Sequence, residues 1–262
     1  MGNAYEERLG TDRMLPLIFK MSLPAVAAQL VNLLYNIVDR IYIGHIPGIG
    51  TDALAGIGVT SAVIILISSF SAIVGAGGSP LAAIALGQGN RERAGQILGN
   101  GFILLLIFTI LTSATTYLFM EPILLFTGAS ENTIGYATDY LSIYLLGTLF
   151  VELSVGLNTF INTQGRPTIA MYSVLIGAIL NIGLDPLFIF TFGMGVKGAA
   201  LATILSQACS AIWVISFLTS KKASLRLEYR YMKLHKGIIL SILALGVSPF
   251  IMASTESWWA LS

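Results

Sequence analysis

The sequence predicts an all-α integral membrane protein, a six-helix transmembrane bundle followed by the start of a seventh span. Of its 262 residues, 55% are hydrophobic and only 10% are charged, whereas roughly 25% are charged in an ordinary soluble domain. The mean hydropathy is +0.83. Its 27 glycines lie largely within apolar runs, where small residues let transmembrane helices approach closely. These observations exclude a soluble fold.

Charged residues and turn formers divide the chain into apolar segments of at least the roughly 20 residues that a bilayer core requires. The first segment is longer than the core of a signal peptide, so we expect a retained span. The expected spans are 17–43, 53–86, 94–120, 136–161, 168–192 and 198–219, and a seventh starts near Gly237. Residues 53–90 carry no charge and exceed one straight crossing of about 30 Å, so this helix has to tilt, kink or extend beyond the bilayer.

The lysine and arginine positions predict the orientation, because cytoplasmic loops of membrane proteins are enriched in these residues. In the six-span arrangement, 12 of the 14 basic residues lie on one side, and only Arg40 and Lys197 do not. We therefore expect the N-terminus to be cytoplasmic. The expected organisation is a cytoplasmic N-terminus at 1–16, a six-span bundle at 17–219, a basic cytoplasmic loop at 220–236 and a truncated seventh span at 237–262.

The remaining composition excludes several classes of function. The net charge is +1, so no overall field attracts nucleic acid. One cysteine, Cys209, and two histidines, His45 and His235, are too few for a disulfide framework or a Cys/His metal cluster. We interpret Cys209 as a packing residue and the histidines as solvated loop residues. The chain has no HExxH or GxGD motif and no recognisable nucleophile set, so we expect no enzyme.

A polar stripe runs along the first span. Its members are spaced by three, four and three residues, which places them on one helix face: Gln29, Asn32, Asn36 and Asp39. An ionisable side chain inside a membrane costs at least about 2.5 kcal/mol on insertion scales and is therefore a candidate for function. Two interpretations remain open. The stripe lines a water-filled cavity, or it hydrogen-bonds neighbouring helices.

The fifth and sixth spans carry polar residues at a similar depth. Asn181 and Asp185 are four residues apart and share a face, and Pro186 removes a backbone hydrogen bond beside them. At about 1.5 Å per residue, Asp39, Asp185 and Thr203 lie roughly 6 to 10 Å below the outer ends of their helices. Their oxygens suit a hard cation such as Na⁺, and two carboxylates out of bulk water can hold a proton. Alternatively, they are three separate residues that reach water at the rim.

Glu152 lies nearer the middle of the fourth span, about 14 Å from its inner end at the same rise per residue. It lines a cavity, or it forms an ion pair with Arg40 or a hydrogen bond to a neighbouring helix, and the sequence leaves these interpretations open. Arg40 directly follows Asp39, but adjacent residues on a helix do not face each other, so this adjacency is no evidence of a pair.

Four segments, in their order and spacing, carry a specific signal over nearly the whole chain. They are SLPAVAAQLVNLLYNIVDRIYIG, GAGGSPLAAIALGQGNRERA, NTFINTQGRPTIAMYSVLIGAILNIGLDPLFIF and GVKGAALATILSQ. The chain resembles the multidrug and toxic compound extrusion (MATE) transporters, close to their bacterial DinF-like branch. The resemblance implies two six-helix lobes around a central cavity, of which this chain matches the N-terminal lobe. It implies efflux of a drug-like, often cationic compound in exchange for Na⁺ or H⁺ across the bacterial cytoplasmic (inner) membrane.

The resemblance also implies roles for particular residues. The coupling ion is expected to bind to Asp39, Asn181, Asp185 and Thr203, with no other cofactor and no metal beyond Na⁺. From their positions in the first and fourth spans, and not from the resemblance, we expect the substrate cavity to include Gln29, Asn32, Asn36 and Glu152. Arg40 and Glu152 do not belong to the family pattern. The expected partners are a small drug-like substrate and the lipid bilayer, and no nucleic acid.

The second lobe of the family does not follow in this sequence, so transport would require the missing C-terminal lobe or a second copy of the chain. Two alternatives to efflux remain. The first is a truncated membrane protein that does not transport. The second is a lipid-linked oligosaccharide flippase of the same superfamily, which would be expected to line its cavity with several cationic residues, whereas only Arg40 is available here.

Overall fold

The computed structural model describes residues 14–259, and in this range it consists of helices joined by turns and loops. Six helices are long and apolar enough, by length and composition, to cross a membrane. They are α2 (Met14–Gly44), α3 (Gly50–Gly87), α4 (Arg91–Leu118), α6 (Ile134–Thr163), α7 (Pro167–Pro186) with the π-helical turn η1 (Leu187–Thr191), and α8 (Val196–Thr219). The other elements are α5 (Met120–Phe126), the 3₁₀ turn η2 (Tyr229–Tyr231) and α9 (Lys236–Trp259).

The predicted all-α membrane fold is confirmed, because each of the six expected spans corresponds to one of these helices. The helix ends differ from the expected ones where polar residues extend a helix beyond its apolar part. The helix α4 begins at Arg91 rather than at residue 94 because the side chain of Asn90 caps it. The Asn90 side chain accepts a hydrogen bond from the backbone N–H of Arg93 at 3.0 Å, which satisfies one of the unpaired donors of the first turn.

The uncharged stretch that exceeds one bilayer crossing forms a single continuous helix, α3, of 38 residues with Pro80 inside it. Its glycines permit close packing. A Cβ atom on Gly77 would collide with the carbonyl oxygen of Ile242 in α9, and one on Gly78 would lie 2.7 Å from the ring of Phe160 in α6. The backbone of α3 therefore serves as a contact surface for α9 on one side and for α6 on another.

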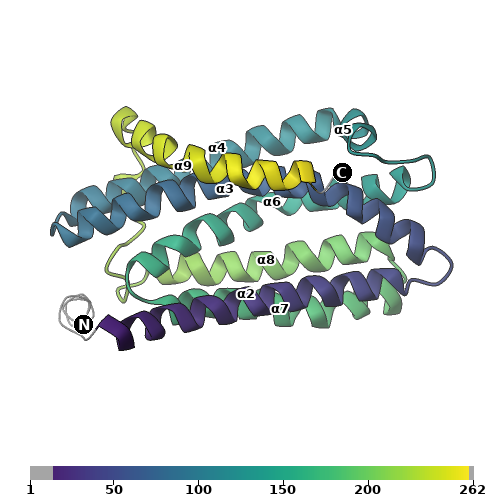
Figure 1. The fold of residues 1–262 in the computed structure, drawn as a ribbon, viewed down its shortest axis with the longest axis horizontal. Helices are drawn as coiled ribbons and strands as arrows, with labels where there is room; N and C mark the ends of the chain where they lie inside the picture. Colours follow the sequence, from purple (N-terminus) through teal and green to yellow (C-terminus); the bar gives the residue numbers. More distant parts are fainter. Residues whose placement is uncertain (1–13, 260–262) are drawn as a thin grey trace.

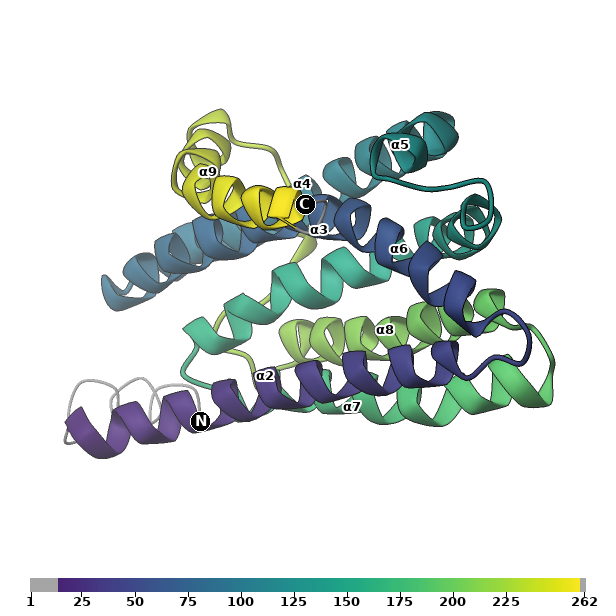
Figure 2. The ribbon, with the colours of Figure 1, turned by 45° about the vertical axis from the view of Figure 1, so that its right-hand side comes forward.

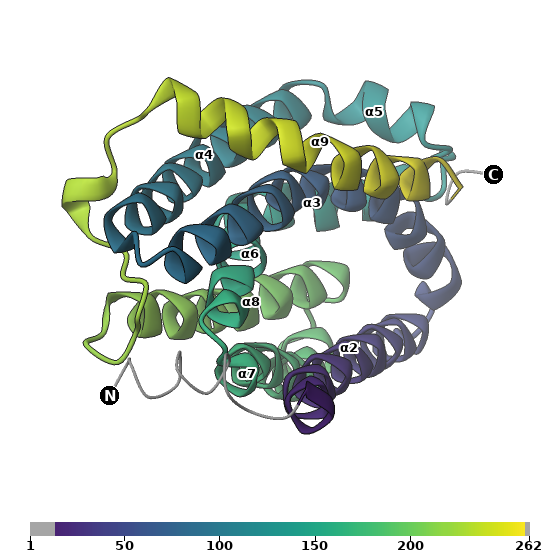
Figure 3. The same cartoon turned by 60° about the vertical axis from the view of Figure 1, so that its left-hand side comes forward.

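The helix α6 lies at the centre of the bundle and packs against α3, α4 and α8. Figures 1 and 2 show α2 and α7 side by side at one edge, with α8 between them and the rest of the bundle. Figure 3 shows α9 on the opposite side, lying along α3 and α4. The sequence order of the helices therefore differs from their order in space, and the first and fifth spans become direct neighbours.

The helix α2 is peripheral, and it is the least apolar of the six long helices. Leu23 is 69% exposed, and Leu30 and Leu34 are each 57% exposed. Only the C-terminal end of α2 buries large side chains, such as Ile43, which joins a core cluster with Ile189 and Val196. The polar end of α2 is therefore held against the bundle, whereas most of the helix presents an apolar face that no described residue covers.

The segment between α8 and α9 is attached to the bundle by two buried amide side chains. Asn100 on α4 donates hydrogen bonds to the carbonyl oxygens of Gln96 and Lys233, at 2.7 and 3.0 Å, and accepts one from the backbone N–H of His235 at 2.8 Å. Gln164, which follows α6, accepts from the backbone N–H of Leu225 at 3.0 Å. We call these two residues the amide clamp.

Candidate functional site

Asn181 and Asp185 lie on the buried face of α7, one helical turn apart. Asn181 is 2% exposed and Asp185 is fully buried. The amide nitrogen of Asn181 donates to Oδ1 of Asp185 at 3.2 Å and approaches the hydroxyl oxygen of Thr203 in α8 to 3.5 Å. The four-residue spacing thus orients the two α7 side chains together, and the packing of α8 adds a hydroxyl group to them.

Asp39 approaches this group from α2. The side chains of Asp39 and Asp185 interact electrostatically with each other, and α2 packs alongside α7. The structure therefore brings together all four residues that the sequence suggested as ion ligands, and we call them the ion cluster. Arg40 interacts electrostatically with Asp39 but is itself exposed.

The ion cluster contains oxygen atoms that have no hydrogen-bond donor. Within residues 14–259, Oδ1 of Asp39, Oδ1 of Asn181 and Oδ2 of Asp185 are buried and make no hydrogen bond. Buried carboxylates without donors are strongly unfavourable unless a cation or a proton compensates them. No group of three or more His, Cys, Asp or Glu side chains in the same range is suited to a metal ion.

Two tyrosines that the sequence reading did not identify border the ion cluster. Tyr140 on α6 is buried and interacts with the side chain of Thr203 and electrostatically with Asp39. Tyr35 on α2 interacts electrostatically with both Asp39 and Asp185. A spacing signal existed for Tyr35, which lies four residues before Asp39 on the same helix face. None existed for Tyr140, since its position depends on how α6 packs.

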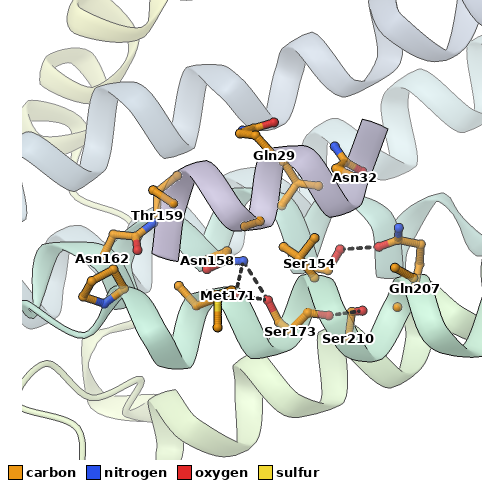
Figure 4. Close-up of a pocket in the computed structure, with 18 of the residues that line it drawn as sticks. Gln29, Asn32, Ser154, Asn158, Thr159, Asn162, Met171, Ser173, Gln207 and Ser210 are labelled. Atoms are coloured by element: carbon orange, nitrogen blue, oxygen red, sulfur yellow. Dashed lines mark hydrogen bonds between the residues drawn. The ribbon is translucent and has the colours of Figure 1, made fainter. Parts of the chain in front are cut away.

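A polar cavity of about 270 Å³ lies next to the ion cluster, between α2, α6, α7 and α8. Figure 4 shows Gln29 and Asn32 of α2 across from Ser154 and Asn158 of α6. Hydrogen bonds order its wall. Ser154 donates to Oε1 of Gln207 at 2.8 Å, and the amide nitrogen of Asn158 donates to the hydroxyl oxygen of Ser173 at 2.7 Å. The side chain of Tyr35 also lines the cavity, so this residue connects the cavity to the ion cluster.

Two of the four residues expected in the substrate cavity line this cavity. Gln29 and Asn32 line the cavity, but Asn36 does not. Asn36 is exposed, and its amide nitrogen donates to the carbonyl oxygen of Asn32 at 2.7 Å. Asn36 therefore shares a helix face with the other three residues of the stripe but does not share their surroundings.

Glu152 does not line this cavity either. It is 1% exposed inside the bundle, and neither of its carboxyl oxygens has a hydrogen-bond partner among the described residues. The backbone of Ser71 in α3 lies against it. The ion pair with Arg40 does not form within the part of the chain that the structure describes, because Glu152 faces α3 whereas Arg40 is exposed on α2.

Comparison with known proteins gives consistent matches. A family model described as MatE matches residues 24–187. The chain is 28% identical over 231 residues to "Multidrug export protein MepA" of Staphylococcus haemolyticus (strain JCSC1435), covering 88% of this chain and 51% of that protein. It is 34% identical over 194 residues to "FAD transporter" of Shewanella oneidensis, covering 72% of this chain and 42% of that protein. The chain thus spans about half the length of these curated relatives.

Two solved structures match the fold in different conformations. One is titled "Inward-facing conformation of a multidrug resistance MATE family transporter of the MOP superfamily", with a TM-score of 0.82 and 26% identity, covering 94% of this chain and 55% of that chain. The other carries the corresponding title for the outward-facing conformation, with a TM-score of 0.83 and 27% identity, covering 90% and 52%. The chain resembles both conformations to the same degree.

Proposed function

The chain belongs to the MatE family, and we propose that it forms the N-terminal lobe of a multidrug efflux transporter that exchanges a drug-like, often cationic compound for Na⁺ or H⁺. The observation that carries this proposal is the pair formed by Asp39 and Asp185, two carboxyl groups from different helices with buried oxygens that lack donors. Tyr35 links the pair to a polar cavity large enough for part of a small molecule.

In this mechanism Na⁺ or H⁺ binds from the outside to the ion cluster. Binding compensates the charge of Asp39 and Asp185, which removes the repulsion between α2 and α7. Since α2 is the least enclosed helix of the bundle, it can move against α7 at low cost. Tyr35 and Gln29 lie on the same helix as Asp39, so such a movement alters the cavity wall. The ion drives efflux only if it binds more tightly to the state that holds the drug weakly.

One lobe does not complete this cycle. The similar TM-scores against inward-facing and outward-facing structures, 0.82 and 0.83, support a lobe that keeps its overall helix arrangement in both states, apart from a local change such as the movement of α2. Alternating access in such transporters requires two units that rock against each other. We therefore propose a second six-helix lobe, or a second copy of this chain, as the partner across the exposed face of α2.

The proposed location is the inner membrane of a bacterium, with the N-terminus and the 220–236 loop in the cytoplasm. Twelve of 14 basic residues support this orientation. Lys197, one of the two exceptions, is paired with Asp139 at 3.3 Å, so its charge is locally compensated.

A flippase is disfavoured, because the residues that line the polar cavity include no lysine or arginine to hold a pyrophosphate group.

The test is drug efflux from proteoliposomes under separately imposed Na⁺ and proton gradients, using a two-lobe protein in which this chain is the first lobe. Asp185→Asn keeps the size of the side chain but removes its charge, so efflux should fall much further than drug binding does. Asp52→Asn is the matched control, because it removes one exposed carboxylate in the first turn of α3. Undiminished efflux by Asp185→Asn under both gradients would contradict the proposal, and loss under one gradient would identify the coupling ion.

A further inference from the structure

A basic cavity lies at the end of the molecule remote from the ion cluster. Its volume is about 470 Å³, and it lies between the N-terminal turns of α4 and the segment that joins α8 to α9. Figure 3 shows this segment passing the N-terminal end of α4 on its way to α9. Five of the side chains that line the cavity are basic: Arg91, Lys221, Lys222, Arg226 and Arg230.

The wall of the basic cavity is held in place by hydrogen bonds and packing. The backbone N–H of Leu225 donates to the Gln164 side chain at 3.0 Å, and that of Leu227 donates to the carbonyl oxygen of Leu218 at 2.9 Å. The ring of Tyr231 packs directly on Gly95, where a Cβ atom would lie 2.7 Å from the ring. These contacts fix the cavity wall, so the basic side chains extend from an ordered backbone.

The charge of the basic cavity is not balanced by its acidic residues. Among the described residues that line it, Glu228 is the one acidic residue, and its carboxylate pairs with Arg230 at 2.6 Å. The guanidinium group of Arg226 donates to the carbonyl oxygens of Lys221 and Ala223, which satisfies donors without removing the charge. Lys221 and Lys222 are exposed beside it. Like charges gathered around one cavity favour the binding of an anion there.

The positive-inside tendency explains basic residues on this side of the membrane, but it does not explain why they converge. Five other basic residues on the same side do not line the basic cavity: Lys20, Arg93, Arg166, Lys233 and Lys236. The first turn of α4, which forms part of the wall, adds the partial positive charge of a helix N-terminus. The cavity thus holds more positive charge in one place than the membrane topology of the chain requires.

We propose that the basic cavity binds a phosphate group of an anionic ligand at the membrane surface. Phosphate oxygens accept charge-assisted hydrogen bonds from arginine and lysine, and basic pockets beside transmembrane helices hold lipid head groups at this level of a membrane. The ligand is the head group of an anionic phospholipid or a soluble phosphate compound, which share this chemistry. Binding does not depend on drug transport, so it can be tested on the chain alone.

The experiment is native mass spectrometry of the purified chain in neutral detergent, titrated with phosphatidylglycerol, phosphatidylcholine and inorganic phosphate. The double variant Lys221→Gln/Lys222→Gln removes two cavity charges, and Lys233→Gln/Lys236→Gln removes two charges from the same segment outside the cavity. We expect the first pair to weaken phosphatidylglycerol binding about 30-fold, since each basic residue near an anionic head group contributes about fivefold. The second pair should change it less than about twofold. Circular dichroism of both variants checks that the helices are retained.

The outcomes separate a defined site from diffuse attraction. Equal weakening by the two double variants, or no weakening by either, would overturn the proposal. Binding of phosphatidylglycerol over phosphatidylcholine that inorganic phosphate does not displace supports the site with a lipid head group as its ligand. Binding of inorganic phosphate that the cavity variant abolishes, without preference for phosphatidylglycerol, supports it with a soluble phosphate compound.

Discussion

Asn100 and Asn181 are both asparagines buried within the helix bundle, 0% and 2% exposed, and they differ in what their side chains bind. Both polar atoms of Asn100 are satisfied, by backbone groups of Gln96, Lys233 and His235. The amide nitrogen of Asn181 also has partners, but its oxygen has none among the described residues. Because buried polar groups are normally paired, the first pattern indicates a structural contact, whereas the second agrees with the ion site that we propose.

The same difference separates the surroundings of the two asparagines. Around Asn100, Gln164 of the amide clamp has both its oxygen and its nitrogen in hydrogen bonds. Around Asn181, Asp39 and Asp185 each retain one buried oxygen without a donor. The side chains of both amide-clamp residues thus have their polar atoms paired, whereas the ion cluster keeps three oxygen atoms without a donor among the described residues. Substitutions in the amide clamp should therefore affect stability, and substitutions in the ion cluster should affect ion binding.

The largest expected effect is on cation binding by Asp185→Asn. Removing one of two charged ligands should weaken Na⁺ binding roughly 100-fold, corresponding to about 3 kcal/mol, while the free energy of unfolding should change by less than about 1 kcal/mol. The measurement is calorimetric titration of the chain in detergent with Na⁺ at constant ionic strength, together with proton uptake after a pH jump. Asp52→Asn serves as control. Unchanged Na⁺ binding and unchanged proton uptake would mean that Asp185 does not bind an ion, and the surroundings of Asn100 and Asn181 would then not differ in function.

Asn100→Ala should give the next largest effect, on stability. The substitution removes the hydrogen bonds that hold Lys233 and His235, each worth about 0.5 to 1.5 kcal/mol, and we expect a loss of about 2 kcal/mol in the free energy of unfolding. Thermal unfolding in detergent, followed by circular dichroism, measures it. Asn36→Ala is the matched control, since its exposed amide bonds only within α2. The interpretation of Asn100 as structural is wrong if both variants unfold at the same temperature or if Asn100→Ala alters Na⁺ binding.

A smaller effect on stability is expected from Gly99→Ala. A Cβ atom here would collide with the carbonyl oxygen of Tyr231, so it would displace the segment that Asn100 holds. Overpacking costs about 1 to 3 kcal/mol, and the helix preference of alanine over glycine recovers about 1 kcal/mol, which leaves a net loss of roughly 1 kcal/mol.

Gly58→Ala provides the control, because no atom lies within 4 Å of its Cβ position. This variant should be neutral or more stable, by up to about 1 kcal/mol. The same unfolding measurement compares the two variants. Equal stability would mean that the segment moves freely away from α4, contrary to its tight attachment.

The sequence predicted the helical spans well because bilayer thickness and charge limit their length and position. The residues 17–43 and 198–219, for example, could be assigned without any knowledge of helix packing. The sequence could not give the order of the helices in space. That α2 lies beside α7, and that α9 lies against α3, depends on contacts such as Gly77 with Ile242, which leave no periodic signal.

The site was predicted to a smaller extent. Spacing placed Asn181 with Asp185, and depth grouped Asp185 with Asp39 and Thr203. The resemblance then named all four as ion ligands, and the structure brings their side chains together. Spacing alone could not say which neighbour Asn36 has, because residues on one helix face need not contact the same neighbouring helix. The amide clamp was not anticipated at all, since the partners of Asn100 are more than a hundred residues away in sequence and are backbone atoms that carry no residue-specific signal.

The smallest expected effect is that of Asn181→Ala on cation binding. Asn181 contributes a neutral oxygen, and the carboxyl groups of Asp39 and Asp185 remain after its removal. Loss of one neutral contact, worth about 1 kcal/mol, should weaken Na⁺ binding about fivefold, well below the effect of Asp185→Asn. The same calorimetric titration measures it, with Asn158→Ala as control in the polar cavity, where the amide nitrogen bonds to Ser173. Because Asn181 also donates to Asp185, a loss as large as that of Asp185→Asn would mean that Asn181 acts by orienting the carboxylate rather than as a ligand, and the unpaired oxygen would then not mark an ion position.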